Sequence, residues 1–147
     1  MIVQIQRRGD PRTSSPVATD PPLASEAAPS PVVAVFGSPG RLGGLAEHLP
    51  SGWSLRRPRG LADLRPDEIV LIVGAGVADV AGVRAGVSGR TRIVALVDAA
   101  APAEVVSGVL SAGADVCVRG GHPAVLAGHL VACRRRQLTD RWSRLTT

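Results

Sequence analysis

The sequence contains no lysine and no tyrosine, and aromatic residues make up only 2% of its 147 residues. All 17 basic residues are therefore arginine, and the formal net charge is +5. Arginine without lysine, in a chain rich in Ala, Gly, Val and Pro, is typical of a GC-rich coding sequence. Proteins that bind single-stranded nucleic acid add several stacking aromatic side chains to their basic surface. The composition therefore argues against a nucleic-acid partner.

Cysteine is scarce, and long apolar runs are absent. Cys117 and Cys133 are the only cysteines, and neither C-x-x-C nor the histidine spacing of a metal site accompanies them, so we expect free thiols and no metal site or disulfide. No apolar run approaches the roughly 18 residues of a membrane-spanning helix. The first ten residues, MIVQIQRRGD, lack the apolar region of a secretory signal. These absences predict a cytoplasmic protein with no membrane contact.

The chain length is that of one domain with a real core. Residues 7–31 are rich in Pro, Ser, Ala and Asp and show no hydrophobic periodicity. Such a segment cannot bury enough apolar surface to offset the entropy lost on ordering. We therefore predict a disordered N-terminal arm at 1–31, an α/β domain at 32–136 and a C-terminal helical extension at 137–147.

Short apolar runs alternate with helix-length segments from residue 32 onward. Three of the runs are almost continuously apolar, as is typical of strands buried on both faces of a parallel sheet. The runs are 32–36, 53–57, 69–73, 92–97 and 115–118, and the helix-length segments are 40–49, 60–64, 77–87, 102–114 and 122–137. The alternation predicts an α/β three-layer sandwich with a five-stranded parallel sheet. At this size the common solution is the flavodoxin-like (CheY-like) strand order 2-1-3-4-5.

Two stretches resemble the receiver domain of bacterial response regulators. The segment RPDEIVLIVG, at 65–74, resembles its third strand, which is often preceded by Pro-Asp. The stretch 92–136 resembles its second half: an apolar strand, a helix ending in AGAD, a short VCV strand, a loop and a long last helix. The resemblance covers about residues 32–136. It implies a signalling domain that takes a phosphoryl group on an aspartate with the help of Mg²⁺.

The residues that such chemistry requires are missing on the first and third strands. A receiver places two acids after the first strand to hold Mg²⁺, because hard divalent cations need carboxylates. Here those positions are Phe36 and Gly37, or Gly37 and Ser38 in a shifted register. The phosphoacceptor aspartate at the end of the third strand is replaced by Gly74.

The two groups that contact the phosphoryl oxygens of a receiver are also missing. The threonine or serine after the fourth strand corresponds to Asp98, and the lysine after the fifth corresponds to Gly120, with Arg119 beside it. Transferred phosphate needs cationic or metal compensation. We therefore predict a degenerate pseudo-receiver that lacks the phosphoacceptor, has no catalytic residue, metal or cofactor, and is not an enzyme.

A second interpretation makes the glycine-rich loop a nucleotide site. Gly37, Gly40 and Gly43 form G-x-x-G-x-x-G after a strand and before a predicted helix, where backbone N–H groups can receive a pyrophosphate. Arg56 and Arg57 after the second strand would suit a 2′-phosphate. Against it, Pro39 removes one N–H donor from the loop. A small Rossmann-like nucleotide-binding domain stays the alternative.

The last predicted helix carries more apolar residues than the core needs. Leu126, Leu130 and Cys133 should face the sheet. Leu138, Trp142 and Leu145 repeat the same spacing on a displaced stripe, and they are flanked by Arg134, Arg135, Arg136, Arg141 and Arg144. The stripe predicts docking to a protein partner or a homodimer through the last helices. The other interpretation, the tail of a truncated linker, stays open.

Overall fold

The computed structural model describes residues 30–146. The predicted N-terminal arm at 1–31 lies outside the described residues except for Ser30 and Pro31. The helices and strands from Val32 onward build one compact unit that begins at Pro31. None of the helices in this described part is long and apolar enough to cross a membrane.

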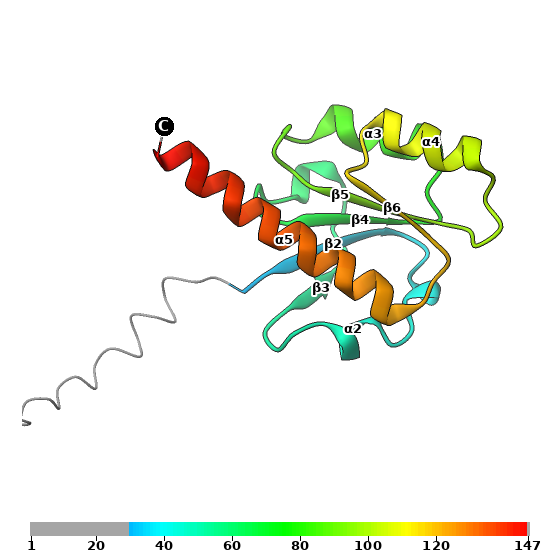
Figure 1. Cartoon of the computed structure of the whole chain (residues 1–147), viewed down its shortest axis with the longest axis horizontal. Coiled ribbons are helices and arrows are strands. Elements are labelled where there is room, and N and C mark those ends of the chain that lie inside the picture. Colours follow the sequence, from blue (N-terminus) through cyan, green and yellow to red (C-terminus); the bar gives the residue numbers. More distant parts are fainter. Residues whose placement is uncertain (1–29, 147) are drawn as a thin grey trace, which may run out of the picture. The chain divides into compact units, whose positions relative to one another are not determined.

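The described unit is built on a five-stranded sheet in which every strand pairs in parallel with its neighbours. The strands are β2 (Val32–Gly37), β3 (Ser54–Arg56), β4 (Ile69–Val73), β5 (Ile93–Val97) and β6 (Val116–Arg119). Their spatial order is β3-β2-β4-β5-β6, which is 2-1-3-4-5 along the chain (Figure 1). The predicted flavodoxin-like fold is thereby confirmed.

Helices cover both faces of the sheet and so make three layers (Figure 1). The helices α2 (Leu45–His48) and α5 (Pro123–Thr146) lie on one face, and α3 (Val77–Gly86) and α4 (Ala103–Ala112) lie on the other. Strand β4 is buried throughout, because its side chains point alternately to the two faces of the sheet and helices cover both faces. Leu71 joins the core under α5, whereas Ile72 joins the core under α3 and α4.

The first two helix-length segments differ from the prediction. Residues 40–49 do not form one helix: a 3₁₀ turn, η2 (Pro39–Leu42), is separated from the four-residue α2 by Gly43 and Gly44. Gly44 has a φ of +84°, which ends any continuous right-handed helix. Segment 60–64 forms only the 3₁₀ turn η3 (Leu61–Asp63). The predicted helices there were wrong because Gly40, Gly43 and Gly44 disfavour one continuous helix in the first segment, and the second has only five residues.

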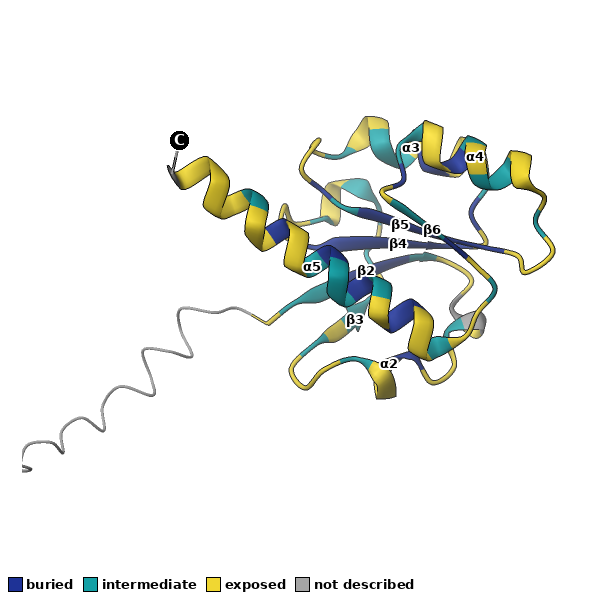
Figure 2. Cartoon of the chain, in the orientation of Figure 1, coloured by how far each residue is buried: buried dark blue, intermediate teal, exposed yellow. Residues whose placement is uncertain are grey.

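The last helix is longer than the core requires. Helix α5 continues without a break from Pro123 to Thr146. Its first half buries Leu126, Leu130 and Cys133 against the sheet. Its second half is mostly exposed (Figure 2).

Candidate functional site

The sequence-predicted receiver positions lie at the carboxyl ends of the strands. Gly37 ends β2 opposite Val73 of β4, and Arg119 ends β6 opposite Val97 of β5. Parallel strands bring these ends to the same edge of the sheet, where ligands of open α/β sheets bind. Phe36 is different, because its half-buried side chain packs against the core under α3 and α4. Phe36 is therefore a packing residue.

Gly37 leaves no room for a side chain. Its φ is +96°, and a Cβ built on it would lie 2.2 Å from the carbonyl oxygen of Val73. Real Cβ atoms do not approach a backbone oxygen so closely, so only glycine fits between β2 and β4 at this point. A carboxylate for Mg²⁺ is thus excluded here by the packing as well as by the residue type.

Gly74 and Gly120 also turn the chain in the left-handed region. Gly74 has a φ of +72°, and its N–H donates to the carbonyl of Leu96 at 2.9 Å. Gly120 has a φ of +87°, and its N–H donates to the carbonyl of Val97 at 3.0 Å. Neither position supplies a nucleophile or a cation. Strand β2 therefore ends in a glycine, and β4 and β6 are each followed by one, at positions where a receiver carries a functional side chain.

Asp98 holds a turn at the end of β5. Its Oδ1 accepts a hydrogen bond from the N–H of Ala100 at 2.9 Å, and its carbonyl accepts one from Ala101 at 3.0 Å. This arrangement is an Asx-turn, a common use of aspartate before a helix. Within residues 30–146, no group of three His, Cys, Asp or Glu side chains is placed to hold a metal ion.

The glycine-rich loop borders a hollow through Leu42. Its volume is about 330 Å³, and its lining residues are Val35, Leu42, Leu55, Arg56 and Arg57. A Cβ at Gly40 would touch only the Ser38 hydroxyl at 4.0 Å, and one at Gly43 would touch nothing. Gly40 and Gly43 are thus not required by close packing, and the helix that follows has only four residues.

Arg56 is committed to an ion pair inside the domain. Its Nε lies 2.6 Å from Oε2 of Glu68, and its Nη2 donates to Oε1 of Glu68 at 3.0 Å. Arg56 also pairs with Asp63 at 3.2 Å. The expectation that Arg56 meets a 2′-phosphate is therefore replaced by a structural role. Arg57 remains at the rim of the hollow, where its Nη2 lies 3.5 Å from the carbonyl of Gly37.

Glu68 is a buried acid that sequence reasoning missed. Its side chain is only 2% exposed. Burial acts to raise its pKa, but hydrogen bonds from Arg56 and from the N–H of Arg65 outweigh burial and hold the pKa of Glu68 below its usual value. The same pair raises the pKa of Arg56. A signal was present, since Glu68 directly precedes a buried strand, where an unpaired acid would be costly.

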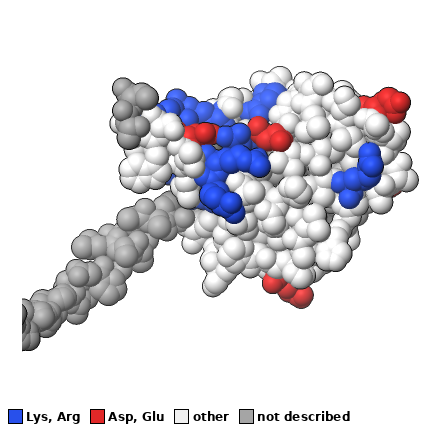
Figure 3. All heavy atoms as spheres, viewed as in Figure 1, with Lys and Arg blue, Asp and Glu red and all other residues white. Residues whose placement is uncertain are grey.

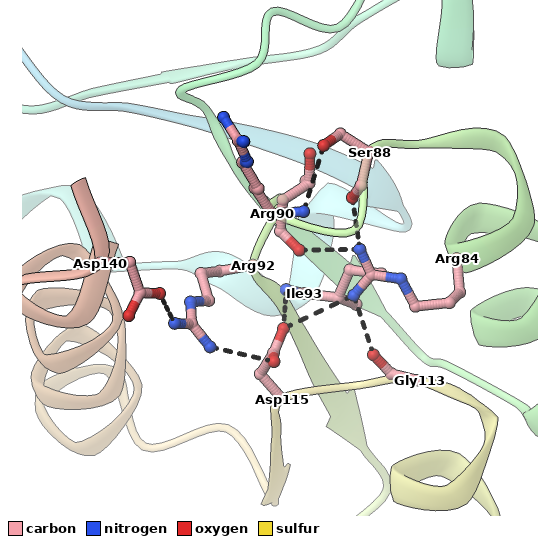
Figure 4. A network of polar contacts seen from close by, with 9 residues as sticks. Arg84, Ser88, Arg90, Arg92, Ile93, Gly113, Asp115 and Asp140 are labelled. Atoms are coloured by element: carbon pink, nitrogen blue, oxygen red, sulfur yellow. Dashed lines mark hydrogen bonds and ion pairs between the residues drawn. The ribbon is translucent and has the colours of Figure 1, made fainter. Parts of the chain in front are cut away.

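A second polar network lies at the amino ends of β5 and β6 (Figure 4). Asp115 is its centre: Oδ2 accepts from the N–H of Ile93 at 2.8 Å, and Oδ1 accepts from Arg92 at 3.3 Å. Arg84 approaches Asp115 to 3.8 Å and also donates to the carbonyl of Gly113 at 3.2 Å. Asp115 is the aspartate of the AGAD segment, so the feature that carried the resemblance has a structural role.

This network also holds the C-terminal half of α5. Arg92 forms an ion pair with Asp140 of α5, and both side chains lie at the meeting point of β5, β6 and α5 (Figure 4). Gln137, one helical turn before Asp140, is also buried. Helix α5 therefore stays attached to the domain beyond residue 136.

The predicted apolar stripe of α5 lies in solvent. Leu138, Trp142 and Leu145 are 39%, 67% and 75% exposed, respectively. We call these three residues the C-terminal stripe. They are separated from the core-facing residues around the helix, so the structure keeps the displacement that the sequence predicted.

Comparison with known proteins supports the fold. No family model matches the chain, and no curated protein matches it in sequence. Among solved structures it is similar to a response regulator receiver domain protein (CheY-like) from Methanospirillum hungatei JF-1, with a TM-score of 0.57 and 13% sequence identity. The match covers 77% of this chain and 99% of that chain. The described unit therefore has the receiver fold.

Proposed function

We propose that this chain is a receiver-like regulatory domain of the cytoplasm that acts through protein contacts and takes no phosphoryl group on an aspartate. One observation supports this most: Gly37, Gly74 and Gly120 occupy the strand ends where a receiver needs an acid, a nucleophile and a lysine. The fold is that of a receiver, whereas these strand ends carry no residue that could bind Mg²⁺ or accept a phosphoryl group. Contacts with a protein partner or a second copy are assigned to the C-terminal stripe, which exposes apolar side chains that the core does not use.

Incubation with acetyl phosphate and Mg²⁺ is expected to leave the intact mass of the protein unchanged. Without a carboxylate at Gly37 the metal has no ligand there, and without an aspartate at Gly74 there is no nucleophile. The measurement is intact-protein mass spectrometry, with a receiver domain that has all its active-site residues treated in parallel as the positive control. A phosphoryl adduct mapped to an aspartate would refute the proposal.

Nucleotides are expected to leave the melting temperature unchanged. A ligand that binds only the native state at 100 times its Kd adds about 2.7 kcal/mol of stability, so a real site would be visible in a thermal shift. NAD, NADP, ATP and cyclic dinucleotides should each give no shift at millimolar concentration. A reproducible shift that disappears in Gly40→Asp would favour the nucleotide-binding alternative.

A further inference from the structure

The C-terminal stripe has the shape of a helix-pairing seam. Leu138, Trp142 and Leu145 follow one another at spacings of four and three residues on α5. At about 100° per residue they fall within a strip about 60° wide. An amphipathic helix that covers a broad core needs an apolar face of at least about 100°, whereas a two-helix seam is narrower. The stripe therefore fits the apolar edge of a single partner helix.

The rest of α5 fixes the direction in which the stripe points. Gln137 is buried, and Asp140 is paired with Arg92 of the domain. Asp140 lies about 160° around the helix from Leu138, so the contact with the domain and the stripe are on nearly opposite sides. The stripe is thus held outward before any partner arrives, which lowers the ordering cost of binding.

The borders of the stripe are positively charged. Measured around the helix from Leu138, Arg135 lies about 60° to one side and Arg141 about 60° to the other, just outside the stripe, and Arg134 lies on the same side as Arg141, about two turns earlier. The acid within 134–146 is Asp140, which is already paired with Arg92. Figure 3 shows arginine side chains gathered over the C-terminal half of α5. A partner that covers the stripe must therefore bring acidic groups to both borders.

We propose that the C-terminal stripe binds an acidic amphipathic helix of another protein, with leucine-like residues on its seam and Glu or Asp on its flanks. This inference rests on the proposed function as a protein-contact domain and names the chemistry of the partner. The apolar seam supplies the contact area, and opposite charges at the flanking positions set the choice of partner and its orientation, as in coiled coils.

Other occupants fit these features less well. A second copy would bring arginine borders against arginine borders, and like charges across an interface are unfavourable. Nucleic acid would satisfy the arginines but would leave Leu138 and Leu145 unburied. A membrane surface favours a broad apolar face with cations kept on the opposite side, whereas here the arginines lie directly beside a narrow seam.

The proposal is tested with two synthetic peptides of about three heptads, longer than the roughly 12 to 15 residues below which an isolated helix is marginal in water. Both carry Leu at the a and d positions; one carries Glu and the other Lys at the e and g positions. Fluorescence anisotropy of each labelled peptide is measured against the full chain. The acidic peptide is expected to bind at least tenfold more tightly than the basic one, and its affinity should fall as salt is added.

Variants locate the binding on the stripe. The double substitution Leu138→Ala and Trp142→Ala should weaken binding of the acidic peptide at least about tenfold, because it removes most of the apolar area that these two side chains would bury against the peptide. Val125→Ala is the matched control, because Val125 is also exposed on α5, at 52%, but lies near the start of the helix. Reversal of both borders, with Arg135→Glu and Arg141→Glu, should transfer the preference to the basic peptide. Thermal melting shows that each variant is folded.

Several outcomes overturn the inference. One is equal affinity for the acidic and the basic peptide, and another is a preference for the acidic peptide that reversal of the arginines does not change. A third is binding to anionic vesicles or single-stranded DNA that is tighter than binding to the acidic peptide and that the stripe substitutions abolish. A dimer in sedimentation that the same substitutions dissociate would make a second copy the occupant. That last result would retain the proposed function, whereas phosphorylation on an aspartate would refute the proposed function without bearing on the stripe.

Discussion

Gly37→Ala is expected to lower the free energy of unfolding by about 3 to 5 kcal/mol. A left-handed backbone costs a residue with a Cβ about 1 to 2 kcal/mol. The larger part comes from the Cβ itself, which would lie 2.2 Å from the carbonyl oxygen of Val73, so that β2 and β4 must separate at this point. Urea unfolding at neutral pH measures the loss.

Gly43→Ala is the matched control in the same loop. Gly43 has a φ of −56°, and a Cβ there meets nothing within 4 Å. The control should stay within about 0.5 kcal/mol of the parent protein. If Gly37→Ala were as stable as Gly43→Ala, the close approach of β2 to Val73 would be wrong. The structural exclusion of an acid from this strand end would then fail with it.

Arg56→Leu is expected to lower the Tm by about 5 to 10 °C at neutral pH. The substitution removes the cation that lies 2.6 Å from Glu68 and leaves a carboxylate that is only 2% exposed without its main partner. An unpaired buried charge is destabilising because it has lost its hydration. Arg57→Leu is the control, since Arg57 is exposed and donates only a long hydrogen bond of 3.5 Å to Gly37. Calorimetric melting compares the two variants.

The effect of Arg56→Leu is expected to depend on pH. In the parent protein the folded pKa of Glu68 lies below its unfolded value of about 4.3. The ion pair with Arg56 therefore stabilises the fold fully above the unfolded pKa, and this stabilisation is lost as the pH falls through the folded pKa. In the variant the hydrogen bond from the N–H of Arg65 remains, but burial is the largest influence on Glu68 and raises its folded pKa. The destabilisation by the unpaired Glu68 carboxylate is therefore complete at neutral pH and vanishes as the pH falls below the unfolded pKa of Glu68.

The difference in Tm between parent and Arg56→Leu should accordingly narrow between pH 7 and about pH 4. Adding Glu68→Gln to Arg56→Leu should recover most of the lost Tm at neutral pH, because no buried charge is left, and should remove the pH dependence of the difference. A loss of Tm that is the same at both pH values would show that Arg56 acts through packing and not through the charge of Glu68.

The absence of the residues that a receiver uses was visible in the sequence, whereas the lack of space for a side chain at Gly37 was not. The absence of aspartate at Gly74 and of an acid pair at Gly37 follows from reading the residues once the strands are placed. That Gly37 cannot accept a side chain depends on a contact with Val73, 36 positions along the chain, in the neighbouring strand. Sequence spacing does not report such a distance.

The sequence by itself determined the class of fold, because continuous apolar runs alternating with helix-length segments are typical of a parallel sheet covered on both faces. The strand order was expected as the common solution for a domain of this size. The sequence also determined the spacing of the C-terminal stripe. The tertiary structure alone decided that Arg56 pairs with Glu68, and that Arg92 pairs with Asp140 and so turns the stripe outward. These features join residues distant in the sequence, and the free energy of an ion pair depends on burial and distance, which exist only after the chain has folded.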